Sequence, residues 1–305
     1  MAELMDAFLR ANLVAALVIL AVMALRIPAR LRFGPELAYR MWAAPPLAAI
    51  ATLVPLRTGK AVMHPLAHLA PADLAPQMLT LWLLGFVGAI AAMAWMQAAF
   101  LREARAGRAG PAVVGVVTPT VVMPPDDGRY SPEERALIRA HEREHINRKD
   151  PRAGALMAAF QCLAWFNPLV HLGVHLARLD QELACDAAVL RRHPTSRTLY
   201  AKTLLKTQLA CAPLPLGCYW PARSRHPLEV RVELLRRGPG SDSIEGPMLV
   251  MTGIVVAALL AWAAEPPLPP SPPRGVLAQD WSSGGKGQMS VMLVTWRVPS
   301  RSAAH

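Results

Sequence analysis

The chain has 305 residues, of which 53% are hydrophobic and only 17% are charged, and its formal net charge is +11. Soluble domains usually carry about 25% charged residues, so this composition argues against an ordinary soluble domain and favours a membrane protein. The positive charge is compatible with basic cytoplasmic loops and with a nucleic-acid interface. Long apolar runs favour basic cytoplasmic loops of a membrane protein, because a nucleic-acid module has no need of such runs.

Four apolar runs predict four transmembrane helices, at residues 7–25, 41–56, 79–101 and 248–264. A helix needs roughly 17–25 apolar residues to cross the hydrocarbon core, and the first and third runs qualify easily. The second run is short, so we expect it to include residues 37–40. The first run could instead be a secretory signal, but acidic residues precede it and basic residues follow it, which is the reverse of a signal peptide. We therefore expect an uncleaved first span.

The placement of lysine and arginine predicts the topology. Four arginines lie between the first two spans and three follow the third, whereas only Arg57 and Lys60 lie between the second and third. The positive-inside rule places the arginine-rich segments in the cytoplasm, with both termini outside the inner (cytoplasmic) membrane. We therefore predict a mainly α-helical, multi-pass membrane protein surrounded by lipid. Its expected parts are three transmembrane helices (1–101), a cytoplasmic domain (102–246), a fourth span (247–264) and a Pro-rich external tail (265–305).

The cytoplasmic domain begins with local signals for strands and then for a helix. Residues 113–123 are rich in β-branched side chains and predict a short strand pair. Ser131, Pro132 and Glu134 mark a helix start, because serine caps, proline suits the first helical position and glutamate completes a capping box. This helix is expected to run to about residue 148, before Pro151.

The capped helix carries the sequence His-Glu-Arg-Glu-His at residues 141–145. His141 and His145 are four residues apart, so both imidazoles project from one helix face and can bind one Zn²⁺ ion. Glu142 lies beside that face, where it can take a proton from a water whose pKa zinc lowers toward about 7. It can then pass the proton to a leaving amine. The spacing therefore predicts a hydrolytic zinc site with Glu142 as the catalytic base.

A catalytic zinc ion needs a third protein ligand, and Glu182 is the candidate. It lies on a separate predicted helix over about residues 172–191, and Asp186 follows one turn later on the same face. Asp186 could accept a hydrogen bond from a ligating histidine and fix its tautomer. The alternative is an acidic patch on a solvated helix face.

Three patterns in order resemble the BlaR/MecR-type membrane zinc metallopeptidases, peptidase family M56. They are HExxH-I-x-R-x-D at 141–150, F-N-P-L at 166–169 and E-x-x-C-D at 182–186. The resemblance covers about residues 7–264. It implies a gluzincin-like zinc domain between the third and fourth spans, in which His141, His145 and Glu182 bind Zn²⁺ and Glu142 is catalytic.

The resemblance also implies a substrate and a circuit. Members cleave a cytoplasmic protein, often a winged-helix repressor that controls β-lactam resistance. Their antibiotic receptors carry a penicillin-binding domain after the last span, for which residues 265–305 are too few. We therefore expect a separate sensor protein as a partner. The alternative function is a non-catalytic membrane signalling scaffold stabilised by zinc.

The apolar run at residues 153–177 is long enough to cross the bilayer, but a crossing would separate Glu182 from the two histidines. One zinc ion could not then bind all three. We therefore predict that this segment dips into the membrane and returns near Asn167 and Pro168, or packs as a buried hairpin.

Four other features have weaker functional interpretations. His171 and His175 could form a second zinc pair, but no glutamate follows His171, so packed histidines are the preferred interpretation. Residues 283–286 match the S-x-x-K acylation motif, but its two glycines disfavour the helix that this chemistry needs. Arg236 and Arg237 are interpreted as a cytoplasmic anchor rather than a self-cleavage site. Direct nucleic-acid binding is not expected, because the arginines follow the membrane edges and no recognition motif is present.

Overall fold

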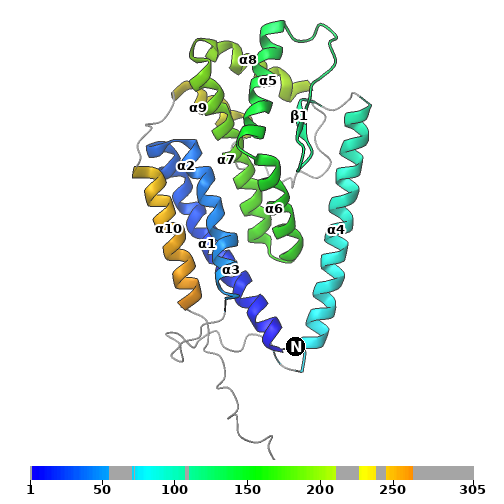
Figure 1. Cartoon of the computed structure of the whole chain (residues 1–305), viewed down its shortest axis with the longest axis vertical. Coiled ribbons are helices and arrows are strands. Elements are labelled where there is room, and N and C mark those ends of the chain that lie inside the picture. The colour runs from blue at the N-terminus through cyan, green and yellow to red at the C-terminus, as the bar shows by residue number, and fades with distance from the viewer. Residues whose placement is uncertain are drawn as a thin grey trace, which may run out of the picture. The chain divides into compact units, whose positions relative to one another are not determined.

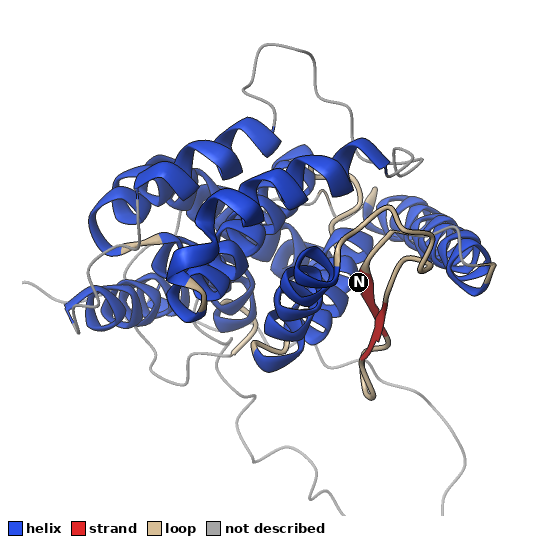
Figure 2. Ribbon diagram, turned by 90° about the horizontal axis from the view of Figure 1, so that it is seen from above, coloured by secondary structure: helices blue, strands red, loops and turns tan. Residues whose placement is uncertain are grey.

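The computed structural model describes residues 2–54, 71, 73–106, 110–210, 227–237 and 245–263. Apart from one two-stranded sheet, the regular structure of these residues is helical (Figure 2). The elements are α1 (Ala2–Phe33), α2 (Pro35–Arg40), η1 (Met41–Ala43), α3 (Ala44–Ala51), α4 (Ala75–Arg105), β1 (Ala112–Val114), β2 (Thr120–Val122), α5 (Pro132–Asn147), α6 (Asp150–Leu163), α7 (Pro168–Arg192), η2 (Pro194–Ser196), α8 (Arg197–Ala210), α9 (Pro227–Arg237) and α10 (Glu245–Ala263).

Two of the described helices, α1 and α4, are long and apolar enough to cross a membrane. α4 exposes large apolar side chains such as Leu84 and Trp95, which are 69% and 62% accessible. The predicted second span is helical from Pro35 to Ala51 with a 3-10 turn between α2 and α3, and residues 55 and 56 lie outside the described part. The predicted fourth span corresponds to α10, whose apolar part is the shorter stretch Met248–Leu260.

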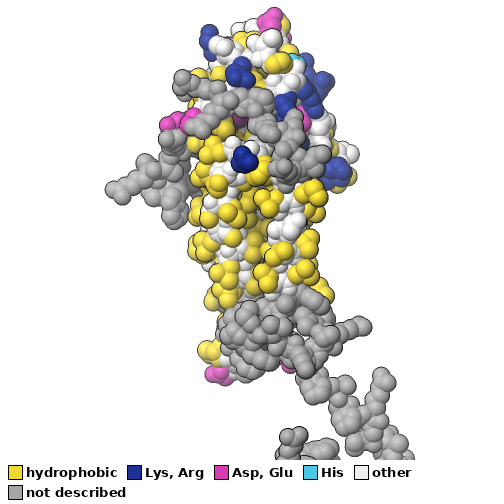
Figure 3. Space-filling model, turned by 90° about the vertical axis from the view of Figure 1, so that its left-hand side faces the viewer, with side chains coloured by type: hydrophobic (Ala, Val, Ile, Leu, Met, Phe, Trp, Pro, Cys, Tyr) yellow, Lys and Arg dark blue, Asp and Glu magenta, His cyan; other side chains and the backbone are white. Residues whose placement is uncertain are grey.

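Hydrophobic side chains dominate the middle of the face shown in Figure 3, whereas lysine and arginine side chains lie mostly toward its upper end. That upper end holds α5, α8 and α9 (Figure 1). The separation matches an apolar region for lipid contact beside a polar region that carries the predicted zinc motif.

The apolar run at 153–177 forms a helical hairpin, in which α6 and α7 lie side by side and the chain turns at residues 164–167 (Figure 1). Asn167 caps α7, since its side-chain oxygen accepts a hydrogen bond from the Leu169 backbone N–H at 3.1 Å. Pro168 occupies the first turn of α7, where a backbone N–H would have no partner within the helix, so its missing N–H costs no hydrogen bond. The chain therefore turns back at the residues where the sequence predicted it.

The hairpin packs along α1, and the contacts follow the same order in both helices. Phe8 meets Phe166 with ring centroids 5.8 Å apart, and Ile19 and Val170 share one buried cluster. Farther along, Arg26 donates hydrogen bonds to Asp180 at 3.1 and 3.2 Å. α1 and α7 therefore run parallel, and α7 extends from the apolar region to the predicted metal site.

Aromatic residues at the hairpin turn also contact α4. Trp82 donates a hydrogen bond to the Leu163 carbonyl at 2.9 Å, and Trp165 donates one to the Trp82 carbonyl at 3.2 Å. Gly85 allows this approach, because a Cβ atom there would overlap the Trp165 indole. The hairpin turn is thus held between the two helices that are long enough to span a membrane.

The polar region has its own hydrophobic core. It consists of side chains from α5, α7, α8 and α9: Leu137, Val189, Leu190, Tyr200, Leu204 and Leu235.

β1 and β2 pair antiparallel, with Ala112 opposite Val122, as the β-branched run predicted. Residues 227–237, within a polar stretch that carries no sequence motif, form α9. Arg231 and Leu235, four residues apart, are both buried on one face of this helix.

Candidate metal centre

The helix with the histidine pair begins as the sequence predicted. The Ser131 hydroxyl accepts a hydrogen bond from the Glu134 backbone N–H at 3.2 Å, and the Glu134 carboxylate accepts one from the Ser131 N–H at 2.9 Å. This reciprocal capping box satisfies two backbone donors that the first helical turn leaves without partners. Lys206 of α8 also donates to Glu134 at 2.8 Å, which ties the start of α5 to α8.

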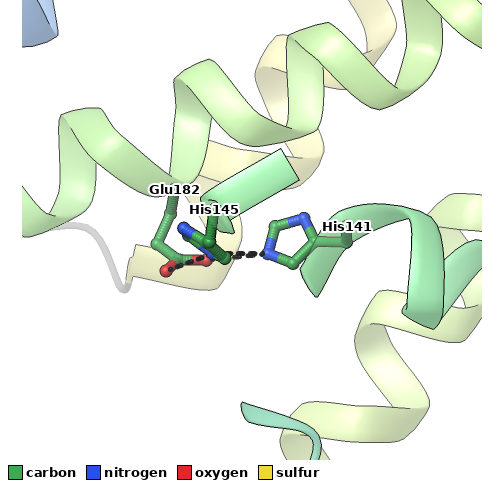
Figure 4. Close-up of side chains that lie close together, drawn as sticks. All are labelled: His141, His145 and Glu182. Carbon is green, nitrogen blue, oxygen red and sulfur yellow. Dashed lines mark hydrogen bonds and ion pairs between the residues drawn. The ribbon is translucent and has the colours of Figure 1, made fainter. Parts of the chain in front are cut away.

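His141 and His145 of α5 converge with Glu182 of α7 (Figure 4). Their Nε2 atoms are 3.2 Å apart, and the Glu182 carboxylate oxygens lie 3.3 Å from His141 Nε2 and 3.5 Å from His145 Nε2. Zinc bonds of 2.0–2.2 Å place tetrahedral ligand atoms roughly 3.4 Å apart. The three donors therefore fit one Zn²⁺ ion and leave a fourth position open. Glu182 is 34% accessible, so solvent reaches this position.

Glu142 follows the first histidine and is 7% accessible. Burial raises the pKa of its carboxyl group, against the lowering effect of the neighbouring imidazoles of His141 and His145. A carboxyl group with a raised pKa accepts and returns protons more readily near neutral pH than an ordinary glutamate does. The environment of this carboxyl group is therefore suited to proton transfer.

Two of the three candidate donors have strongly shifted pKa values. Burial works to raise the pKa of Glu182, but Arg231 and His141 outweigh it and lower that pKa to about 2. Burial works to lower the pKa of His141, but the carboxylates of Asp186 and Glu182 outweigh it and raise the pKa to about 10. Glu182 is therefore anionic at neutral pH, and the His141 imidazole retains a proton that a bound metal would displace.

A hydrogen-bond chain orients the His141 imidazole. Its Nδ1 lies 2.8 Å from the Tyr200 hydroxyl, which donates to Asp186 Oδ1 at 2.6 Å. The direct distance from His141 Nδ1 to Asp186 Oδ1 is 3.4 Å. With Nε2 facing the metal position, Nδ1–H donates to Tyr200, and this fixes the tautomer that a zinc ligand needs. Asp186 thus acts on His141 mainly through Tyr200. The spacing of the acidic motif does not predict this role of Tyr200.

Asp150 orients the second imidazole, with its Oδ2 atom 2.8 Å from His145 Nδ1. Lys149 has a left-handed backbone conformation with φ of 61°, which ends α5 and directs the chain into α6. Tyr39 of α2 donates a hydrogen bond to Asp150 at 3.2 Å and accepts one from Gln181 at 3.0 Å. The first apolar segments of the chain thus contact the immediate surroundings of the metal ligands.

Arg231 of α9 lies against both acidic residues of α7. Its Nε and Nη2 atoms each donate to Asp186 at 2.8 Å, and its Nη1 atom is 3.0 Å from Glu182 Oε2. The guanidinium is buried, with 7% of the side chain accessible. Sequence reasoning missed this residue, because it lies in a polar stretch without a motif.

Cys185 also lies beside the site, fully buried, and donates to Asp150 at 3.4 Å. Burial raises the pKa of its thiol well above the ordinary value, and together with His145 and Asp150 it forms a second group that could hold a metal ion. His171 contacts Gln161 at 3.2 Å and the Trp165 carbonyl at 2.9 Å. Among the described residues, the groups able to hold a metal contain neither His171 nor His175.

Two imidazoles from an HExxH helix and a glutamate from a later helix define the His₂Glu class of catalytic zinc centre. Residues 105–235, which contain the whole centre, match the family described as BlaR1 peptidase M56. A stretch of 97 residues is 32% identical to the Regulatory protein BlaR1 of Bacillus licheniformis. No solved structure matches the chain.

This match supports the resemblance to peptidase family M56 that was inferred from the three sequence patterns. The aligned stretch covers 32% of this chain and 16% of the Bacillus licheniformis protein.

Proposed function

We propose that this chain is a zinc endopeptidase of a bacterial inner membrane that cleaves a cytoplasmic regulatory protein in a signal-response circuit. The observation that carries the proposal is the convergence of His141, His145 and Glu182 beside the buried Glu142. The match of the same residues to the BlaR1 peptidase M56 family supports it.

Each residue has a distinct role in the proposed reaction. His141, His145 and Glu182 hold Zn²⁺, which polarises the scissile carbonyl and acidifies water when bound. Glu142 removes a proton from the attacking water and delivers it to the leaving amine, for which its raised pKa is suited. Asp150, and Asp186 through Tyr200, keep the imidazoles in the required orientation.

The arginines that meet α7 support a site on the cytoplasmic side of the membrane. Asp180, two residues before Glu182, pairs with Arg26 and Arg30 near the end of α1. The positive-inside rule assigns this arginine-rich end to the cytoplasm, so we place the substrate there too.

The substrate class is inferred from the relative, whose name marks it as a regulatory protein. We propose that this chain cleaves a transcriptional repressor of the winged-helix type or another cytoplasmic regulator. A separate membrane or external protein would supply the stimulus to the spans.

A comparison of proteomes tests the proposal. Cells that express Glu142→Gln should accumulate the intact substrate, while the purified variant binds zinc with the wild-type stoichiometry. Glu133→Gln, an exposed substitution on the same helix, is the matched control and should cleave normally. Continued cleavage by Glu142→Gln would reject the enzymatic mechanism. A wild-type protein that binds zinc but leaves every cytoplasmic protein intact under stimulation would favour the scaffold.

A further inference from the structure

Arg231 stands out because α9 brings it to the metal centre from a part of the chain that holds no metal ligand. Glu182 and Asp186 lie one turn apart on α7, so two carboxylates lie close together, with Asp186 buried and Glu182 half-buried. Like charges in such a place repel each other and would turn the Glu182 side chain outward toward solvent. Some positive group must offset this repulsion if Glu182 is to face the imidazoles.

The guanidinium of Arg231 has the shape for that task. It binds Asp186 through two parallel hydrogen bonds of 2.8 Å and still presents Nη1 to Glu182 at 3.0 Å. Arginine can make both contacts at once because its donors form a rigid planar fork, whereas a lysine ammonium is a single point charge. The oxygen that Arg231 contacts, Glu182 Oε2, is also the one 3.3 Å from His141 Nε2.

We propose that Arg231 is a positioning residue that holds Glu182 in the conformation required of the third metal ligand. The inference rests on the proposed function, because it assumes that these three side chains bind zinc. Arg231 acts on the metal through Glu182 and, by way of Asp186 and Tyr200, through His141. One side chain of α9 thereby orients two of the three ligands.

The packing of α9 explains how this orientation is maintained. Leu235, one turn after Arg231, is 4% accessible and belongs to the core that α5, α7 and α8 share. This apolar anchor fixes the helix, and the helix in turn fixes the guanidinium. A displacement of α9 would therefore change the conformation of Glu182 directly and that of His141 only through Asp186 and Tyr200.

The test measures zinc affinity of the full-length protein in detergent, by competition with a chromophoric chelator. Partners that orient metal ligands usually contribute about 10–100-fold to metal affinity, so we expect Arg231→Gln to weaken zinc binding by about that factor. Arg231→Lys should recover only part of the loss, because it cannot bridge both carboxylates. Lys202→Gln, which removes an exposed positive charge from α8, should bind zinc like the wild type.

A spectroscopic measurement separates positioning from general stability. The visible absorption bands of bound Co²⁺ report ligand geometry, and we expect them to change in Arg231→Gln even when its thermal unfolding midpoint is close to that of Lys202→Gln. If Arg231→Gln fails to fold, Arg231→Gln/Asp186→Asn removes the unpaired carboxylate and should show Co²⁺ bands that differ from those of Asp186→Asn alone. Wild-type affinity and unchanged Co²⁺ bands in a folded Arg231 variant would overturn the inference.

One further variant distinguishes a failure of the Arg231 proposal from a failure of the proposed function. His145→Ala removes a ligand and should bind zinc far more weakly than the wild type. Equal binding by His145→Ala and the wild type would place the metal elsewhere and overturn both proposals. Loss in His145→Ala without loss in Arg231→Gln would overturn only the role of Arg231.

Discussion

Asp180 of α7 and Arg26 of α1 are 154 residues apart in the sequence, and their side chains meet at 3.1 Å in a buried contact. Arg30 and the Trp42 indole bind the same carboxylate at 3.3 and 2.8 Å. Because Glu182 follows two residues later, a single turn of α7 contains both an anchor to α1 and a metal ligand. The buried ion pair between Arg26 and Asp180 therefore fixes the position of Glu182 along the axis of α1.

Asp180→Asn should destabilise the protein strongly. The substitution keeps the size of the side chain but leaves two arginines without their carboxylate, and breaking a buried pair costs roughly 3–5 kcal/mol. The free energy of unfolding of the detergent-solubilised protein checks this. Arg40→Gln is the control, because its ion pair with Glu36 is largely exposed and should contribute less than about 1 kcal/mol. Equal losses in the two variants would contradict the anchoring role.

Asp150→Asn should weaken zinc binding without removing a ligand. Asparagine cannot supply the negative charge that Asp150 places 2.8 Å from His145 Nδ1, so we expect a loss of about 10–100-fold in affinity. Tyr39→Phe removes the hydrogen bonds to Asp150 and from Gln181 but leaves the charge of Asp150 in place, so it should cost less. Chelator competition measures both affinities, and a larger loss in Tyr39→Phe would show that Asp150 does not orient the imidazole.

Gly85→Ala should disturb the contact between α4 and the hairpin turn. The added methyl group overlaps the Trp165 indole, and overpacking of this kind costs about 1–3 kcal/mol. Gly88→Ala is a matched control on the same helix, since no atom outside that helix lies within 4 Å of a Cβ atom there. Thermal unfolding should show a loss for Gly85→Ala alone, and Trp165→Leu in the same chain should restore part of it. Indistinguishable alanine variants would refute the close packing of the hairpin against α4.

The free energy of unfolding should fall at acidic pH, partly because the Glu134 carboxylate becomes protonated. The hydrogen bond from Lys206, together with that from the Ser131 N–H, lowers the pKa of Glu134 below its ordinary value of 4.5. A group whose pKa is lower in the folded state stabilises the protein above the unfolded-state pKa and loses this effect as pH falls. Glu134→Gln should therefore be less stable than the wild type near neutral pH, by under about 1 kcal/mol because the site is near the surface.

The difference between Glu134→Gln and the wild type should narrow as the pH falls below 4.5 and the wild-type carboxylate becomes protonated. Unfolding midpoints at a series of pH values measure it. Lys206→Gln should reproduce most of the effect, since Lys206 is the strongest influence on this carboxyl group. A gap that stays constant with pH would mean that the charge of Glu134 is not involved.

Local signals in the sequence were enough to predict the elements that carry the ligands. The capping box, the four-residue spacing of His141 and His145, and the proline after Asn167 each act over one or two helical turns. The hairpin was predicted by one further argument, that a single ion cannot bind residues on opposite sides of a bilayer. Such signals involve neighbouring residues only, so the linear sequence contains them in full.

The partners of the ligands were decided by tertiary structure. Tyr200, Arg231 and Tyr39 come from three helices that lie far apart in the sequence, and no spacing rule relates them to the histidines. α9 itself was missed because its buried face is made partly of a charged residue, which a hydrophobic pattern does not reveal. A buried arginine is stable only where carboxylates meet it, and that meeting depends on how whole helices pack.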